Sequence, residues 1–282
     1  MESTDGQDNA RVVPLGDEHL AGCLALSKSA SWNQNEADWR LMLGFGRGWG
    51  IALEDGTLAA STLVLPYGER FAWVAMVLVL PEHRRRGFAT QLLKKALNEN
   101  SRSGLASILD ATPAGHEVYR QEGFKDTWGF KRFSLSTSFS SQGNARVITE
   151  SDWPRILELD RQAFGADREV VLRNLAQRLP QAALVSDAGF VLGREGREAT
   201  QIGPLVARDG NSSRELLQSA LGNVKGPVYV DVVDHAMELQ SWIQAKGFAF
   251  QRPFTRMMHV AGEARAPGEA GLVYCPAGPE LG

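Results

Sequence analysis

Residues 76–93 read Met-Val-Leu-Val-Leu-Pro-Glu-His-Arg-Arg-Arg-Gly-Phe-Ala-Thr-Gln-Leu-Leu, and this stretch decides the fold. The apolar run Phe71–Leu80 is about half a membrane span long and predicts a buried strand. Beyond the arginines, apolar side chains recur three and four positions apart, which predicts an amphipathic helix. These side chains are Ala89, Leu92, Leu93, Ala96 and Leu97. A buried strand therefore runs through a short basic loop into a helix.

The loop between this strand and this helix has the composition of an anion site. The first N–H groups of a helix lack intrahelical acceptors and carry the positive end of the helix dipole. Gly87 lets the backbone approach a ligand, the small Ala89 removes bulk, and Arg84 adds charge that pairs with phosphate. A plain basic turn before a helix is the competing interpretation. A nucleotide site fits less well, because no G-x-x-x-x-G-K-[ST] and no G-x-G-x-x-G after a strand occurs.

The flanking segments complete an α/β domain. Helical spacing predicts helices at Leu20–Ser29 and Glu36–Phe45, and two strands flank Asp55-Gly56, a strong hairpin signal. After the amphipathic helix, Ala106–Asp110 predicts another strand, followed by a further helix and a last strand. This order predicts an α/β fold with a mixed sheet.

The chain also repeats itself. Asn9-Ala10-Arg11-Val12 recurs as Asn144-Ala145-Arg146-Val147, and a second echo appears at a constant offset of 124. The second echo pairs Asp110 with Asp234, Gly123 with Gly247, Phe124 with Phe248, Phe130 with Phe254 and Arg132 with Arg256. Each pair falls at the same place in a strand, helix, Gly-Phe, strand pattern. We therefore predict two tandem copies of one fold.

The repeat divides the chain into domains 9–138 and 145–262, with Ser/Gly-rich linker composition between them. The remaining residues, 263–282, are rich in Ala, Gly and Pro and are expected to form a loosely packed tail.

Composition excludes several classes of protein. The 282 residues are 43% hydrophobic with a net charge of −3, which is typical of a globular protein and argues against an extended nucleic-acid surface. Cys23 and Cys275, the two cysteines, are too few for a disulfide framework and lack zinc-site spacing. The polar start has no signal-peptide pattern. We expect a cytoplasmic protein with no metal and no membrane partner.

The strand, loop and helix together resemble motif A of the GNAT acetyltransferases, Q/R-x-x-G-x-G/A, filled here by Arg84, Gly87 and Ala89. In that family the loop cradles the CoA pyrophosphate, and the preceding strand pairs with the pantetheine arm. The resemblance implies a GNAT acyl-CoA N-acyltransferase fold in two copies, with acetyl-CoA as co-substrate. The cofactor-binding residues it implies are Val77, Leu78, Val79, Arg84, Arg85, Arg86, Gly87, Phe88, Ala89, Thr90 and Thr112.

A second motif lies downstream, where Tyr119 stands four residues before Gly123-Phe124 and resembles GNAT motif B. In the family this tyrosine often protonates the departing CoA thiolate, and a phenol suits that task because it stays protonated at neutral pH. Packing against CoA alone is the competing interpretation. Thr112 and Gly115 depart from the Asn and Ala that many members carry, so Thr112 replaces the side chain that usually bonds the pantetheine.

Two further stretches, Trp32-Asn33-Gln34 and Asp110–Gly115, are similar to those of two-domain, YitH-like GNAT proteins. The resemblance places Trp32, Asn33, Gln34 and Asp110 at the acceptor site. The competing interpretation is a helix N-cap and a core aromatic for the helix that starts near Glu36.

The second copy keeps the pattern but loses the chemistry. Its loop, 207–213, has one arginine, and Asp209 would repel a pyrophosphate; Ile243 stands where Tyr119 is expected. We predict that this half does not bind acetyl-CoA productively and instead walls the acceptor pocket. Asp231, Asp234 and Arg252 are the candidates for that wall, against the alternative of ordinary surface charges.

The resemblance implies an N-acetyltransferase that transfers acetyl directly from acetyl-CoA to an amine on a small molecule or peptide. The general base is open, because Met76–Leu80 carries no Glu; water held by Asp110 or a backbone carbonyl is one route, and arrival of a neutral amine is another. A non-catalytic acyl-CoA sensor is the alternative function. A nucleic-acid contact through Arg84–Arg86 is a third, which the acidic net charge disfavours.

Overall fold

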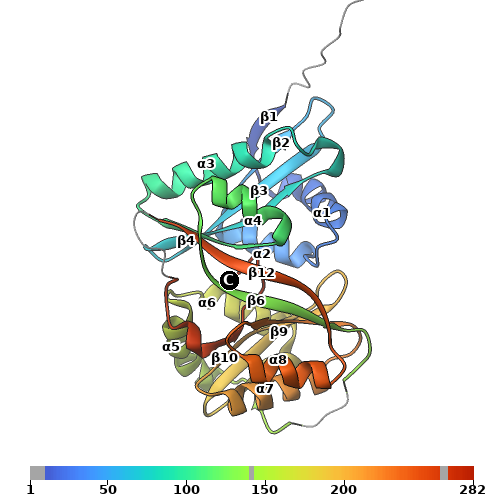
Figure 1. Cartoon of the computed structure of the whole chain (residues 1–282), viewed down its shortest axis with the longest axis vertical. Helices are drawn as coiled ribbons and strands as arrows, with labels where there is room; N and C mark the ends of the chain where they lie inside the picture. Colours follow the sequence, from blue (N-terminus) through green and yellow to red (C-terminus); the bar gives the residue numbers. More distant parts are fainter. Residues whose placement is uncertain (1–9, 140–142, 261–265) are drawn as a thin grey trace, which may run out of the picture.

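The computed structural model describes residues 10–139, 143–260 and 266–282 (Figure 1). Residue 9 of the predicted first domain, residues 140–142 of the linker and residues 261–265 lie outside the described part. Two lobes, one from each half of the chain, lie above and below a pair of long central strands.

The helices and strands follow the predicted order. The helices of the first half are α1 (Leu20–Ser29), α2 (Glu36–Phe45), α3 (Phe88–Arg102) and α4 (Pro113–Gln121). Its strands are β1 (Arg11–Pro14), β2 (Arg47–Ala52), β3 (Leu58–Tyr67), β4 (Phe71–Val79), β5 (Ala106–Ala111) and β6 (Lys125–Leu135). The predicted helices α1 and α2 are confirmed to the residue, and the predicted strand–loop–helix unit is β4 followed by α3.

The second half repeats this order. Its helices are α5 (Trp153–Phe164), α6 (Glu169–Arg178), α7 (Gly210–Gly222) and α8 (Met237–Ala245). Its strands are β7 (Arg146–Val147), β8 (Leu184–Ser186), β9 (Gly189–Arg194), β10 (Thr200–Ala207), β11 (Val228–Val233), β12 (Ala249–His259) and β13 (Val273–Cys275). Short 3-10 helices lie at Asp17–His19, Pro81–His83, Glu150–Asp152, Pro180–Ala182 and Ala270–Leu272.

All strands belong to one sheet in the order β1-β2-β3-β4-β5-β12-β6-β11-β10-β9-β8-β7, with β13 paired to β10. The pairs β4–β5 and β10–β11 are parallel, and the other pairs are antiparallel. The predicted mixed α/β sheet is therefore confirmed.

The two halves exchange their last long strands, a feature that sequence patterning did not predict. β12 of the second half lies between β5 and β6 of the first and pairs with both. β6 of the first half in turn pairs with β11 of the second. Phe130 and Phe254, which the repeat relates, lie opposite each other and stack with ring centroids 4.9 Å apart. The sheet of each half is thus completed by a strand of the other.

The structure corrects one pair of the repeat. Gly123 and Gly247 both have φ of 90°, which supports the offset of 124 there. In the strands, however, Asp110 lies opposite Arg256 and Asp231 lies opposite Arg132. The counterpart of Asp110 is therefore Asp231 and not Asp234, because the loop from β11 to α8 is longer than its counterpart in the first half.

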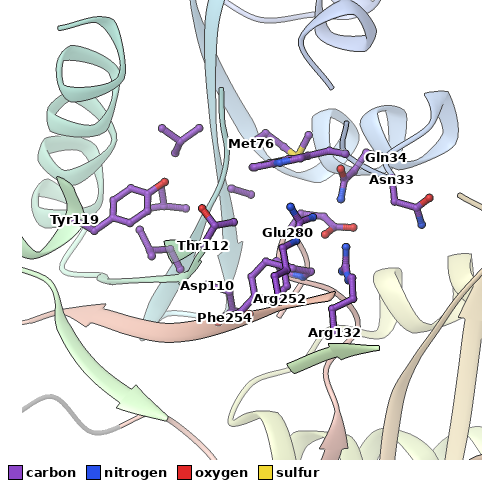
Figure 2. A pocket seen from close by; sticks show the side chains of 16 residues that line it. Asn33, Gln34, Met76, Asp110, Thr112, Tyr119, Arg132, Arg252, Phe254 and Glu280 are labelled. Carbon is purple, nitrogen blue, oxygen red and sulfur yellow. The ribbon is translucent and has the colours of Figure 1, made fainter. Parts of the chain in front are cut away.

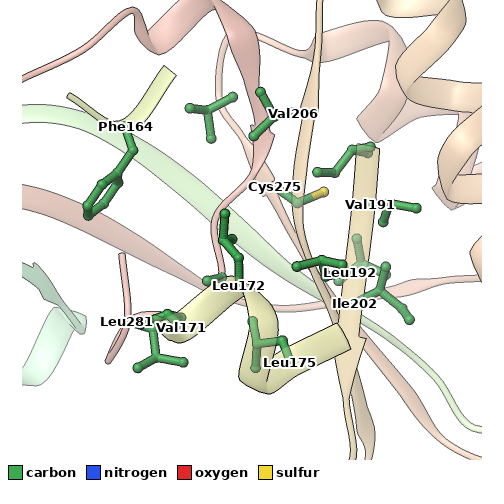
Figure 3. Close-up of a cluster of buried hydrophobic side chains, with 14 of the residues drawn as sticks. Phe164, Val171, Leu172, Leu175, Val191, Leu192, Ile202, Val206, Cys275 and Leu281 are labelled. Atoms are coloured by element: carbon green, nitrogen blue, oxygen red, sulfur yellow. The ribbon is translucent and has the colours of Figure 1, made fainter. Parts of the chain in front are cut away.

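The segment 266–282 is not a loosely packed tail. β13 adds to β10, and Cys275 and Leu281 are completely buried among core side chains of the second half (Figure 3). The Tyr67 hydroxyl donates to the carbonyl of Leu281 at 2.9 Å, so the segment also reaches the first half. Its glycines supply tight turns, with Gly268 and Gly278 at positive φ. The sequence of this segment lacks helix or strand periodicity because it is made largely of turns that pack against the core.

Candidate active site

A cleft opens where β4 and β5 diverge. These strands pair only over Phe71–Trp73 and Ala106–Ile108, while β12 pairs with the opposite edge of β5. The far half of β4 therefore borders a cleft with an empty volume of about 1390 Å³. Six of the predicted cofactor-binding residues line it: Val77, Leu78, Val79, Arg84, Ala89 and Thr112.

A β-bulge bends β4 at the inner end of this cleft. Ser61 pairs with Leu78 and Leu63 with Ala75, so that Met76 and Val77 together face a single residue of β3. Met76 has φ of 51°, and its carbonyl accepts a hydrogen bond of 2.8 Å from the Ser61 hydroxyl. Bulges of this kind redirect the backbone beside active sites.

The basic loop forms the outer end of the cleft. Gly87 is the N-cap of α3 with φ of 81° and makes no side-chain cap, so the first N–H groups of the helix point toward the loop. Arg84 Nε donates to the carbonyl of Val79 at 3.3 Å, which holds this exposed arginine at the cleft. A helix N-terminus beside arginines is the arrangement that is typical of anion-binding sites.

The other predicted loop residues lie around the cleft without lining it. Arg85 has φ of 61° and is exposed, as is Arg86, whose guanidinium lies 5.0 Å from the Phe88 ring centroid. The Phe88 side chain is buried in a cluster with Ile51 and Leu92. Phe88 and Thr90 can therefore act on a ligand in the loop through their backbone N–H groups.

Tyr119 lies at the junction of the cleft and a deeper pocket. It packs edge-on against Phe124 at 5.9 Å, and burial raises the pKa of Tyr119 to about 12. Figure 2 shows its hydroxyl directed toward the interior, on the side of Thr112. Gly115 leaves room for the ring, because a Cβ there would lie 2.9 Å from Tyr119 Cε2.

The deeper pocket has an empty volume of about 480 Å³ and adjoins the cleft. Residues that line both are Trp32, Val77, Asp110, Thr112, Tyr119 and Arg252. The pocket is built from the loop before α2, from β4, β5 and β12, and from the C-terminal segment, which contributes Pro279 and Glu280 (Figure 2). Both halves of the chain therefore form it.

Two predicted acceptor residues line the pocket but are engaged elsewhere. Asn33 is buried, and its amide bonds Glu198 and Ala199 of the second half at 2.9–3.0 Å. Asp110 accepts 2.8 and 2.9 Å hydrogen bonds from Arg256 at both carboxylate oxygens. Asn33 therefore joins the two halves, and Asp110 holds β12 in place.

The other two predicted acceptor residues keep groups available. Trp32 borders both the cleft and the pocket. Gln34 is buried, and its Oε1 has no hydrogen-bond partner among the described residues. The competing interpretation, a helix N-cap and a core aromatic, applies to two residues further along. The Asn35 side chain caps α2 by accepting a hydrogen bond from the Asp38 backbone N–H, and Trp39 is the core aromatic.

Asp231, Asp234 and Arg252 of the second half are predicted to wall the acceptor pocket. Of these three, only Arg252 lines the deeper pocket. Asp231 is buried in an ion pair with Arg132, and Asp234 is a surface group 2.7 Å from Lys131.

Glu280 is a charged pocket residue that sequence reasoning missed. It is 2% exposed, and its Oε1 pairs with Arg194, which also contacts Asp38 at 2.9 Å. Its Oε2 has no hydrogen-bond partner among the described residues. No local pattern marks Glu280, because it lies in a Pro/Gly-rich stretch far along the chain from the motifs.

The equivalent groove of the second half is filled. β10 and β11 pair only over Thr200–Ile202 and then diverge, as β4 and β5 do. There β13 occupies the gap, with Leu205 opposite Cys275 and Val206 opposite Val273. At the start of α7, Asp209 accepts from the backbone N–H of Ser212 at 2.9 Å. In the second half, β13 thus occupies the space that corresponds to the cleft beside β4. The Asp209 carboxylate caps the start of α7, whereas the start of α3 has no side-chain cap.

Over 10–139, 143–260 and 266–282, no group of three or more His, Cys, Asp or Glu side chains could hold a metal ion. Over the same ranges, none of the helices has the length and hydrophobicity needed to cross a bilayer.

Comparison with known proteins agrees with this architecture. A model described as the acetyltransferase (GNAT) family matches residues 16–124, and one described as the acetyltransferase (GNAT) domain matches residues 156–274. The chain thus has the GNAT fold in two tandem copies. It is a tandem GNAT protein, and this membership supports acyltransferase activity in general.

Solved structures show the same fold. A putative acetyltransferase from Pyrococcus horikoshii is 18% identical with a TM-score of 0.80, over 97% of this chain and 96% of that one. A tandem GNAT protein from the clavulanic acid biosynthesis pathway is 16% identical with a TM-score of 0.61, over 91% and 100%. A GCN5-related N-acetyltransferase from Sphaerobacter thermophilus is 16% identical with a TM-score of 0.60, over 88% and 95%. No curated protein sequence matches the chain significantly.

Proposed function

We propose that the protein is an N-acetyltransferase that transfers acetyl from acetyl-CoA directly to an amine. The observation that carries the proposal is a cleft along β4 and an adjoining pocket, with the basic loop before α3 at the outer end and Tyr119 where the cleft and the pocket share their lining. An extended ligand with a phosphate group at one end and a reactive thioester at the other fits this arrangement.

In this proposal the pyrophosphate binds the loop Arg84–Ala89, and the pantetheine arm follows Val77–Val79. The acetyl group then reaches the bulge at Met76, where the redirected backbone supplies N–H groups that polarise the thioester carbonyl. Thr112 borders the same cleft, and its hydroxyl does not cap α4, so it is available to the pantetheine.

The chemistry is direct attack. The amine nitrogen forms a bond to the thioester carbon, the C–S bond breaks, and Tyr119 donates its proton to the departing sulfur. A covalent acetyl-enzyme on Cys23 is disfavoured, because this thiol is fully buried and burial raises its pKa to about 12.

We also propose that the second half does not bind acetyl-CoA. Support comes from β13, which fills the diverging gap, and from Asp209, whose carboxylate already caps α7. The second half contributes Arg252 and Glu280 to the pocket instead. Assignment to the YitH-like subfamily and a cytoplasmic location remain predictions.

The first experiment is an acetyl-CoA titration of the wild-type chain and of the double variant Arg84→Glu/Gly87→Glu. Binding that the variant loses supports the loop as the pyrophosphate site. Binding that persists in the variant points to the second half, and absence of binding in the wild type contradicts the proposal. The intact chain is required, because an isolated second half would lose β6 beside β11.

Turnover is then measured as thiol release with a library of amines. Replacing Tyr119 with Phe should lower kcat much more than it raises the KM for acetyl-CoA, since the phenol acts in the transition state. Binding of acetyl-CoA without release of thiol with any amine would favour the sensor alternative.

A further inference from the structure

Three buried polar atoms around the deeper pocket lack hydrogen-bond partners among the described residues. They are Gln34 Oε1, Arg252 Nε and Glu280 Oε2, and all three residues line the pocket. Leaving such an atom buried and unpaired is unfavourable, because it has given up its hydrogen bonds to water without gaining others. Two acceptors and one charged donor around one small space indicate a ligand that carries both a donor group and an anionic group.

The charges of the pocket single out Arg252 as the anion-binding residue. Arg132 pairs with Asp231, and Asp110 pairs with Arg256, so these groups are neutralised. Arg252 lies opposite Arg132 on the neighbouring strand and has no ion pair within the described ranges. Burial, and then the Arg132 guanidinium, lower the pKa of Arg252. A bound anion would supply the direct ion pair that Arg252 lacks among the described residues.

Glu280 presents the opposite charge to the same space. Its Oε1 pairs with Arg194, a fully buried residue that also contacts Asp38, so the carboxylate is held in one position. Its Oε2 faces no protein donor, and Gln34 Oε1 also lacks one. Figure 2 shows Glu280 between Gln34 and Arg252. These two oxygens are acceptors suited to an ammonium group.

Resting on the proposed function, we propose that the acceptor is a small zwitterionic amine of the amino-acid type. Its carboxylate binds Arg252, and its ammonium group binds Glu280 Oε2 and Gln34 Oε1. The limited volume of the pocket favours a free amino acid or close analogue over a folded protein substrate.

Glu280 also provides the missing proton acceptor. The bound ammonium group gives one proton to the Glu280 carboxylate, and the neutral amine attacks the thioester carbon. The C–S bond breaks, the sulfur takes the Tyr119 proton, and the second proton of the nitrogen returns to the phenolate through water. The products are an N-acetylated acid and CoA thiol, with one proton released from Glu280 to solvent.

The test is thiol release with the free proteinogenic amino acids, each compared with its carboxamide and with its decarboxylated amine. We expect at least one free amino acid to exceed both of its analogues in kcat/KM by about tenfold to a hundredfold, the effect of a hydrogen bond to a charged group. In Arg252→Gln this preference should disappear. Arg208→Gln, which alters an exposed arginine, is the matched control and should keep the preference.

Two variants separate amine binding from folding. Glu280→Gln should raise the KM for the amine and lower kcat, and its unfolding midpoint is measured because Arg194 loses a charged partner. Gln34→Met removes an unpaired oxygen without touching that ion pair and should raise the KM for the amine alone.

The outcomes distinguish the two proposals. If acetyl-CoA binds but the carboxamides and decarboxylated amines are acetylated as well as the free acids, the acceptor class is wrong and the acetyltransferase stands. The acceptor class is also wrong if other amines but no amino acid are acetylated. If Arg252→Gln keeps the preference, the assignment of the carboxylate to Arg252 is wrong. If acetyl-CoA does not bind the wild type, the proposed function fails and the acceptor assignment fails with it.

Discussion

Arg256 of β12 donates two hydrogen bonds, 2.8 and 2.9 Å long, to the carboxylate of Asp110 on β5. Arg132 of β6 makes the same bidentate contact with Asp231 of β11, at 2.8 and 2.7 Å. Each pair is buried and joins one half of the chain to the other. The exchanged strands are thus held by two related ion pairs, and each pair contributes one residue, Asp110 or Arg132, to the lining of the deeper pocket.

Removing one partner of this contact should destabilise the whole chain. Asp110→Ala leaves Arg256 buried between Trp73 and Trp128 without a counter-charge, and we expect a loss of about 3–5 kcal/mol in the free energy of unfolding. Urea denaturation measures it. Asp110→Leu combined with Arg256→Met should lose less than the single variant, because no unpaired charge remains. A single variant as stable as the wild type would show that water reaches Arg256.

The alkaline side of the pH–rate profile should reflect the burial of Tyr119. The phenol must be protonated to act as an acid, and burial raises the pKa of Tyr119 to about 12 from its usual 10. The protonated range therefore extends upward, and kcat should show no loss from this group up to about pH 10. The measurement is kcat against pH at saturating acetyl-CoA for the wild type and Tyr119→Phe. A decline centred near pH 10 that disappears in the variant would contradict the buried environment.

The fold and part of the lining of the cleft along β4 could be predicted because their signals are local. Arg84, Gly87 and Ala89 lie in one strand–loop–helix unit, and apolar spacing alone marks both flanking elements. Helices α1 and α2 follow from the same periodicity. The pairing of β6 with β11 could not be predicted, because the repeated halves carry similar strands and either partner satisfies the pattern.

The acceptor side depends on contacts between distant segments. Asn33 has the polarity expected of a substrate ligand, yet its amide is used by the backbone of Glu198 and Ala199. Glu280 reaches the pocket only because β13 fills the groove of the second half and directs the following residues toward the first. Neither arrangement has a signature in local spacing.

Gly115 should control the position of Tyr119. A Cβ at Gly115 would lie 2.9 Å from Tyr119 Cε2, so Gly115→Ala must displace the ring. Alanine also favours a helix interior over glycine by about 1 kcal/mol, so the variant should remain folded. We expect kcat to fall about tenfold or more, with an unchanged or raised unfolding midpoint. Thiol release and thermal unfolding measure the two effects.

Gly44 provides the matched control for this change. It also lies in a helix, α2, but a Cβ there would meet no atom within 4 Å. Gly44→Ala should raise the unfolding midpoint and leave kcat unchanged. Equal kcat values for the two variants would mean that the Tyr119 ring adapts without losing its function.

The C-terminal segment should behave as part of the core. Leu281 is completely buried beside second-half side chains, and its carbonyl accepts the Tyr67 hydroxyl. Leu281→Ala should therefore reduce the free energy of unfolding by about 2–5 kcal/mol, as in other buried leucine truncations. Val170→Ala, at a side chain that is 62% exposed, is the control and should change it by less than about 0.5 kcal/mol. Because the segment also carries Glu280 into the pocket, Leu281→Ala should raise the KM for the amine as well. Stability and KM indistinguishable from the wild type would show that residues 276–282 leave the groove in solution.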